Sequence, residues 1–142
     1  MTDFANIYMA SSMCLFALPA YVAWQKGDIV LVGLIVVSAL ASALYHLNES
    51  GTHGMRGFSG SSFTTPRWNT VLINLDRAAA LALFGYKAWH MQHMSDVMLG
   101  LAAFCGLVAL AVLAISEMSD HHAYIFIHVL WHSLAALLLL AF

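Results

Sequence analysis

Long apolar runs separated by short polar breaks constrain the fold of this chain more than any other feature. A helix needs about 20 mostly apolar residues to cross a bilayer, and the breaks leave room for five such runs among 142 residues. Backbone groups in lipid must be satisfied within their own segment, and no run alternates as a barrel strand does, so all five are predicted to be helices. The predicted spans are residues 4–25, 29–47, 70–86, 97–115 and 123–142.

The composition supports this all-α, polytopic transmembrane bundle, which we expect to form a single domain over residues 1–142. Hydrophobic residues make up 62% of the chain and charged residues only 8%, whereas about a quarter of a soluble domain is charged. The five Lys and Arg residues are scattered singly, so no nucleic-acid partner is expected. Cys14 and Cys105 lie inside apolar runs and are predicted to be buried core residues. Residues 51–67 are the one long polar loop.

The alternating direction of five helices places a set of polar side chains on one side of the membrane. The end of the second span and the starts of the third and fifth spans share that side. His46 lies at the end of the second span and Asp76 lies about two turns into the third. His128 and His132 lie about two to three turns into the fifth span. We therefore expect Asp76 and the two later histidines at similar depths, with His46 closer to the membrane surface.

Helical spacing indicates what this set can bind. Residues four apart share a helix face, so His128 and His132 point in one direction and Ser42 lies beside His46. Three neutral imidazoles suit a tetrahedral zinc ion and leave its fourth position open. Zinc lowers the pKa of a bound water, and a nearby carboxylate can take the proton. Asp76 is the candidate for that base, and Ser42 is a candidate hydrogen-bond donor.

Each member of the set also has a purely structural interpretation. Asp76 is followed by Arg77 and the two could form an ion pair, although adjacent residues point about 100° apart on a helix. A pair of histidines four apart also arises by chance, and a single intramembrane histidine is commonly a hydrogen-bonded helix contact. Ser42 can equally be a small residue where helices pack.

Taken in order along the chain, the motifs resemble the signature of a known superfamily. Ser-x-x-x-His at 42–46, Asp76 and His-x-x-x-His at 128–132 resemble the CREST membrane hydrolases, which include alkaline ceramidases, progestin and adipoQ receptors, GPI-remodelling proteins and myomaker-like proteins. The strings around the histidines look most like the GPI-remodelling and myomaker branches.

The resemblance implies a metal site and a reaction. It implies one zinc ion held by His46, His128 and His132, with Asp76 and Ser42 contacting water at the metal. It further implies hydrolysis of an amide or ester bond of a lipid, as in a ceramidase or phospholipase.

The number of helices departs from that family. Its members generally have seven helices, whereas this chain has room for five, with one helix rather than three between those of Asp76 and His128. Because the difference is an even number of helices, all site residues stay on the same side of the membrane, and the metal site can persist. Part of the wall of a lipid pocket is lost, however, and either bilayer lipid or a second copy in a homodimer would replace it.

Three functions stay open on the sequence alone. The first is a zinc-dependent intramembrane lipid hydrolase in a multi-pass membrane protein. The second is a non-enzymatic zinc protein with a fusion, receptor or scaffold role, as the myomaker resemblance allows. The third is a haem-binding electron carrier, because histidines on facing helices can ligate haem iron.

Overall fold

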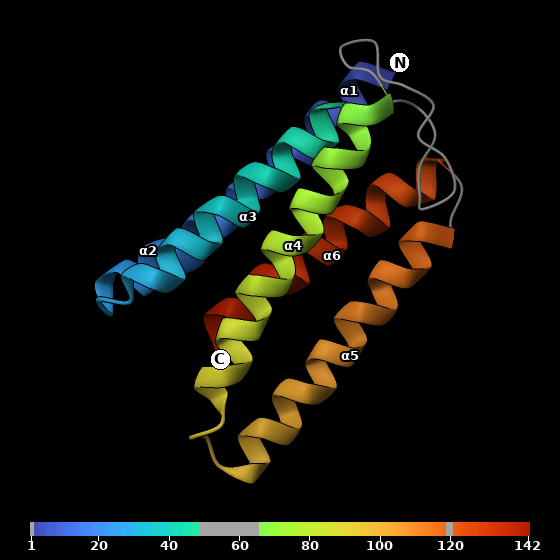
Figure 1. Ribbon diagram of the computed structural model, residues 1–142. Coiled ribbons are helices and arrows are strands. Elements are labelled where there is room, and N and C mark those ends of the chain that lie inside the picture. Colours follow the sequence, from blue (N-terminus) through green and yellow to red (C-terminus); the bar gives the residue numbers. More distant parts are fainter. Residues whose placement is uncertain (1, 49–65, 119–120) are drawn as a thin grey trace.

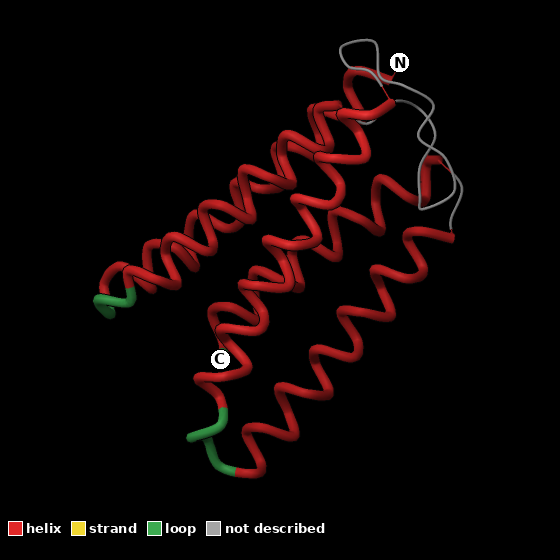
Figure 2. The backbone as a smooth tube through the Cα atoms, in the orientation of Figure 1, coloured by secondary structure: helices red, strands yellow, loops and turns green. Residues whose placement is uncertain are grey.

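The computed structural model describes residues 2–48, 66–118 and 121–142, and every regular element within them is a helix (Figure 1). The elements are α1 (Thr2–Ser11), the 3-10 helix η1 (Ser12–Phe16), α2 (Ala17–Gln25), α3 (Ile29–Asn48), α4 (Pro66–Met91), α5 (Asp96–Met118) and α6 (His121–Ala141). The first three run on without a break, so the chain forms five helical rods joined, where described, by short turns (Figure 2). The predicted all-α bundle is confirmed.

Four of the rods are long and apolar enough to cross a membrane. They cover Ile7–Gln25, Ile29–Asn48, Asp96–Ser116 and Ala123–Ala141, in agreement with four of the predicted spans. The remaining predicted span lies within α4, which has 26 residues and carries the charged pair Asp76 and Arg77. That α4 also crosses stays a prediction, supported by its course alongside α3 (Figure 1).

The predicted loop 51–67 lies outside the described residues except for its last two positions. Pro66 begins α4 instead, because proline suits the first turn of a helix, where its missing N–H has no intrahelical acceptor.

The turn between α2 and α3 depends on Gly27 and Asp28. Gly27 has a φ of 74°, which glycine adopts without strain, and the N–H of Asp28 donates to the Ala23 carbonyl at 3.0 Å to close α2. The Asp28 carboxylate accepts the Leu31 N–H at 3.0 Å and so caps the start of α3. The same oxygen accepts the Tyr86 hydroxyl at 2.8 Å. Asp28 therefore closes α2 with its backbone N–H, and its carboxylate caps α3 and ties α4 to the same turn.

Tighter winding at η1 changes the direction of the side chains in the first rod. Pro19 has no N–H to donate and its ring crowds the preceding turn, and the stretch before it, Ser12–Phe16, is a 3-10 helix. Ser12, Met13 and Phe16 are all buried there. A 3-10 stretch inside a longer helix often lies at a functional position, and Ser12 contacts the site described below.

The core lies where η1, α2, α3, α4 and α6 meet. Its residues are Met13, Phe16, Ala23, Leu31, Ile35, Leu83, Ala135 and Leu139. The fourth rod, α5, packs on α6, and its buried residues include Ala102 and Ala109; such small side chains allow helices to approach closely. Because α4 packs mainly on α3 and α5 mainly on α6, a seam separates α4 from α5.

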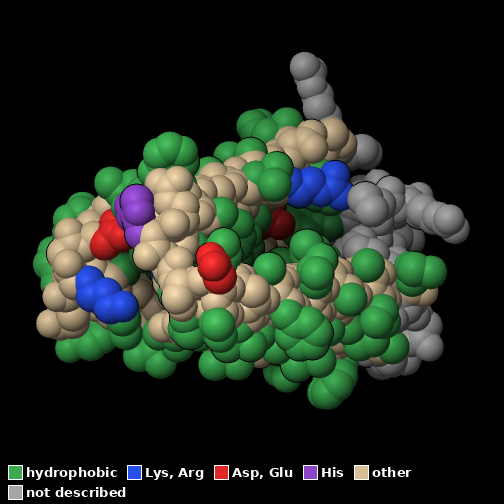
Figure 3. All heavy atoms as spheres, turned by 90° about the horizontal axis from the view of Figure 1, so that it is seen from below, with side chains coloured by type: hydrophobic (Ala, Val, Ile, Leu, Met, Phe, Trp, Pro, Cys, Tyr) green, Lys and Arg blue, Asp and Glu red, His purple; other side chains and the backbone are tan. Residues whose placement is uncertain are grey.

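The outer surface is apolar, with few charged side chains on the face seen in Figure 3. Leu81 and Val97, for example, are 75% and 80% exposed, a distribution that suits lipid rather than water. Cys14 is exposed and Cys105 half-buried, so the prediction that both lie in the core is wrong. An apolar neighbourhood in the sequence does not distinguish a core position from one on the apolar outer surface.

Packing of α4 on the core can be tested with two leucines of that helix. Leu83 is 1% exposed and belongs to the core, whereas Leu81 is 75% exposed. We expect Leu83→Ala to lower the free energy of unfolding by about 2 kcal/mol, because a cavity replaces its contacts. Leu81→Ala should change it by less than about 0.5 kcal/mol. Denaturant unfolding in detergent, followed by circular dichroism, measures both, and equal effects would contradict this packing.

Whether α4 crosses the membrane can be tested by labelling the turn before α3 and the turn after α4. Lys26 precedes α3 and Gln92 follows α4, and both are exposed. With Cys14 and Cys105 replaced, a single cysteine at either position is treated with a membrane-impermeant thiol reagent in sealed vesicles. Two crossings, by α3 and α4, return the chain to its starting side, so both positions should react from the same side. Reaction from opposite sides would show that α4 does not cross.

Candidate metal centre

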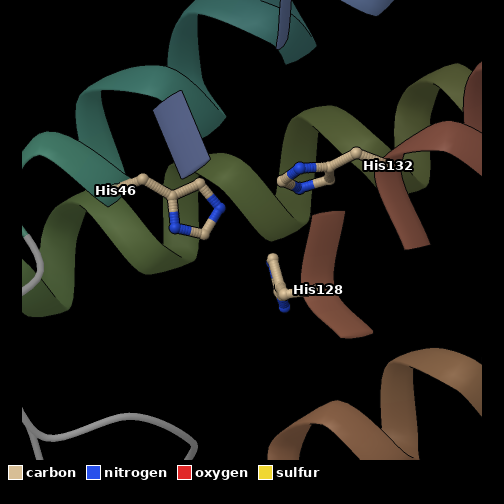
Figure 4. A group of neighbouring side chains, drawn as sticks. All are labelled: His46, His128 and His132. Carbon is tan, nitrogen blue, oxygen red and sulfur yellow. The ribbon is translucent and has the colours of Figure 1, made fainter. Parts of the chain in front are cut away.

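Three histidines from two helices converge inside the bundle. His46 comes from the last turn of α3, and His128 and His132 come from α6. Figure 4 shows His46 and His132 extending towards each other, with His128 beside the space between them. One ring nitrogen of each lies within 4.8 Å of those of the other two. The ring centres are 4.8 Å apart for His46 and His128, 5.3 Å for His46 and His132, and 4.7 Å within the α6 pair.

The prediction that these residues meet is therefore confirmed, although His46 lies much nearer its helix end than the other two. All three side chains are buried, with His46 at 0%, His128 at 6% and His132 at 4% exposure. None of the three is therefore a surface histidine. Buried polar rings are normally held by specific partners, and each ring of the α6 pair has one.

Ser12 of η1 orients the His132 ring. Its hydroxyl oxygen lies 2.6 Å from the Met9 carbonyl and 2.7 Å from His132 Nδ1. A serine hydroxyl has a single proton, and the carbonyl can only accept one. The hydroxyl therefore donates to Met9 and accepts from Nδ1–H, so the lone pair of the His132 ring is on Nε2.

Ser116 of α5 orients the His128 ring by the same arrangement. Its hydroxyl donates to the Leu113 carbonyl at 2.7 Å and lies 3.2 Å from His128 Nδ1. Ser116 is 0% exposed, so no water competes for this hydroxyl. Nδ1–H again donates to the serine oxygen and Nε2 is left to accept. Partners of this kind fix the tautomer and orientation of metal-binding histidines.

The group has the composition and spacing of a site for one transition-metal ion. Imidazole nitrogens suit zinc and its neighbours, whereas calcium and magnesium require oxygen ligands. Tetrahedral zinc holds its nitrogens about 3.3 Å apart, so the ring nitrogens, which lie within 4.8 Å of one another, would move closer together around a bound ion. The three buried histidines can therefore hold a metal ion.

A cavity of about 460 Å³ adjoins the histidines between α3, α4, α5, α6 and η1. His128 and His132 form part of its wall, and so do the two other residues predicted from the sequence, Ser42 and Asp76. Ser42 is buried, one turn before His46, and Asp76 is half-buried on α4. The space-filling view shows a recess that contains an acidic side chain with a basic one nearby (Figure 3).

Some residues at the centre carried no signal in the sequence. Ser12 follows Ser11, and Ser116 ends an apolar run; neither belongs to a motif, and only the packing of η1 and α5 against α6 brings them to the histidines. Tyr124 has a helical spacing of four from His128, and their ring centres lie 5.0 Å apart. The alternative of an Asp76–Arg77 ion pair finds no support in the described ranges, where Arg77 is found in no ion pair.

Comparison with known proteins provides one relative and no family. An uncharacterised protein of Acanthamoeba polyphaga mimivirus is 25% identical over 136 residues, which cover 90% of this chain and 89% of the viral protein. No family model matches the chain. No solved structure matches it either.

The serines that hold the rings provide a test of the metal centre. Ser12→Ala and Ser116→Ala each remove the acceptor of an Nδ1–H, and we expect each to weaken zinc binding by about 10- to 100-fold. Ser11→Ala is the matched control, because Ser11 is exposed and its hydroxyl bonds to the Tyr8 carbonyl instead. Competition with a chromophoric chelator measures the affinities. A loss in the Ser11 variant equal to that in the Ser12 variant would contradict the assignment.

Proposed function

We propose that the chain is a multi-pass membrane protein that holds one zinc ion and hydrolyses an amide or ester bond of a membrane lipid. The observation that carries this proposal is the shared cavity, in which His128, His132, Ser42 and Asp76 border one apolar space. A metal site, a carboxylate and a hydroxyl on one space of suitable volume are the parts that metal-assisted hydrolysis requires.

His46, His128 and His132 would hold the ion, and their three nitrogens favour zinc. When bound, zinc supplies Lewis acidity, which polarises a carbonyl and acidifies water. Structural zinc sites usually have four protein ligands, whereas hydrolytic sites have three. Three histidines beside a cavity therefore favour the enzyme over the non-enzymatic zinc protein. Haem iron takes axial ligands only from its two faces, so three mutually adjacent imidazoles favour a single ion over haem.

Asp76 is the proposed general base. Its carboxylate takes a proton from the attacking water while the water oxygen forms a bond to the carbonyl carbon. The same carboxyl group then returns the proton to the leaving nitrogen or oxygen as the amide or ester bond breaks. The half-buried, mostly apolar surroundings of Asp76 strengthen these charge interactions relative to water.

Ser42 is the proposed donor to the carbonyl oxygen as it becomes negative. It lies on α3 one turn before His46 and borders the same space as Asp76. A fixed donor aimed at developing charge lowers the barrier without reorganisation of solvent. Most of the remaining wall is apolar, formed by residues such as Leu110 and Leu113 on α5, and this part suits an acyl chain.

Substitution of Asp76 tests the reaction separately from the metal. We expect Asp76→Asn to retain one zinc per chain and to lose about 100-fold or more in turnover, because the amide cannot accept the proton. Asn74→Ala is the control, since Asn74 is exposed on the same helix and does not border the cavity. Release of fatty acid from a ceramide and from a phosphatidylcholine in nanodiscs, with metal analysis of the same samples, provides the measurements.

The same samples distinguish the alternatives. Zinc retention without turnover of either lipid by the wild type would contradict the hydrolase and leave a non-enzymatic zinc protein. Failure of the wild type to retain zinc, with no change on His132→Ala, would contradict the metal centre itself.

A further inference from the structure

Arg77 places a positive charge in the proposed active-site cavity. It follows Asp76 on α4 and borders the same space as His128 and His132. Arg77 is exposed, and it makes neither an ion pair nor a hydrogen bond with any residue that the structure describes. A charged side chain at membrane depth is costly unless an opposite charge or water meets it. The missing partner in the protein therefore indicates a negatively charged ligand.

A second polar group in the same wall also has no partner. Ser38 is 8% exposed, and its buried hydroxyl oxygen has no hydrogen-bond partner among the described residues. A buried hydroxyl of this kind is destabilising unless a ligand or water pairs with it. Ser38 lies one turn before Ser42 on α3 and borders the cavity with Arg77. A ligand oxygen would satisfy both groups.

The depths of these two residues agree. The end of α3 and the start of α4 lie at the same end of the bundle (Figure 1). Counted from those ends, Ser38 and Arg77 each lie about 15 Å along their helices, at 1.5 Å per residue. The packing of α4 along α3 keeps these levels side by side.

We propose that Arg77 and Ser38 bind the anionic oxygen group of an acyl lipid, so that the cavity selects acyl lipids with a phosphate or carboxylate over neutral ones. Arginine suits both anions because its planar fork forms two parallel hydrogen bonds to either. The selection of a substrate rests on the proposed function, whereas the binding of the anion does not.

Asp76 does not occupy the proposed anion position. Adjacent residues on a helix point about 100° apart, so Asp76 and Arg77 face different parts of the cavity. The charged and titratable groups of its described wall are these two, the histidines His128 and His132, and Tyr45. Within this wall, Arg77 is thus the positively charged residue that lies outside the metal centre.

Binding of three probes that share one oleoyl chain tests the proposal. Oleoyl lysophosphatidate carries a phosphate, oleate a carboxylate, and monoolein no charge. Their dissociation constants are measured by native mass spectrometry on the zinc-loaded, full-length protein in detergent. We expect the wild type to bind at least one anionic probe roughly 10-fold or more tightly than monoolein. Arg77→Gln should remove this preference, and Arg77→Lys should retain part of it because the charge remains. Ser38→Ala should weaken binding of the anionic probe by a smaller factor.

Lys87→Gln is the matched control for the loss of one positive charge. Lys87 is also on α4 and borders a separate cavity of about 280 Å³ formed with α5 and α6. We expect its substitution to leave the preference unchanged. The zinc content of each variant is measured as well. Unchanged zinc content shows that weaker anion binding does not result from loss of the metal ion.

Each result decides the proposal. A preference for lysophosphatidate supports a lipid headgroup in the site, and a preference for oleate supports a fatty acid carboxylate. Equal affinity for all three probes, or equal losses in the Lys87 and Arg77 variants, would overturn it. Anion binding that depends on Arg77 without any lipid turnover leaves this inference standing while the hydrolase fails. Turnover without any preference for anions overturns this inference alone.

Discussion

The cost of leaving a polar group unpaired in an apolar interior is the constraint on which the rest of this structure depends. Every polar side chain inside the bundle must find its partner in the protein or in a ligand. Asp28 shows the first solution, since it accepts both the Leu31 amide and the Tyr86 hydroxyl. The histidine centre uses both kinds of partner. Serine oxygens accept from the Nδ1 atoms of His128 and His132, and the remaining ring nitrogens are left to bind an ion.

The helices could be predicted because transfer of an apolar run into lipid depends on local sequence alone. Their ends follow from single residues, as Gly27 shows with its positive φ. The spacing of His128 and His132 likewise predicted a shared face. The roles of Ser12 and Ser116 could not be predicted, since each depends on which helix packs against α6. The burial of Cys14 was predicted wrongly for a related reason, because both faces of such a helix are apolar.

The division of the bundle explains where its chemistry is located. Because α4 packs mainly on α3 and α5 mainly on α6, the polar residues collect at the seam between the two pairs. His46 and Asp76 come from the first pair, and His128 and Ser116 come from the second. A site at such a seam is bordered by helices of both pairs, which leave a cavity of about 460 Å³ between them.

The hydrogen bond between Ser12 and His132 joins residues 120 positions apart. Ser12 belongs to the first described rod and His132 to the fifth, α6. The centre therefore cannot be completed until α6 has been synthesised and has packed against the first rod. A chain synthesised only as far as α5 has neither His128 nor His132, and so the order of synthesis keeps such an intermediate from forming the three-histidine site.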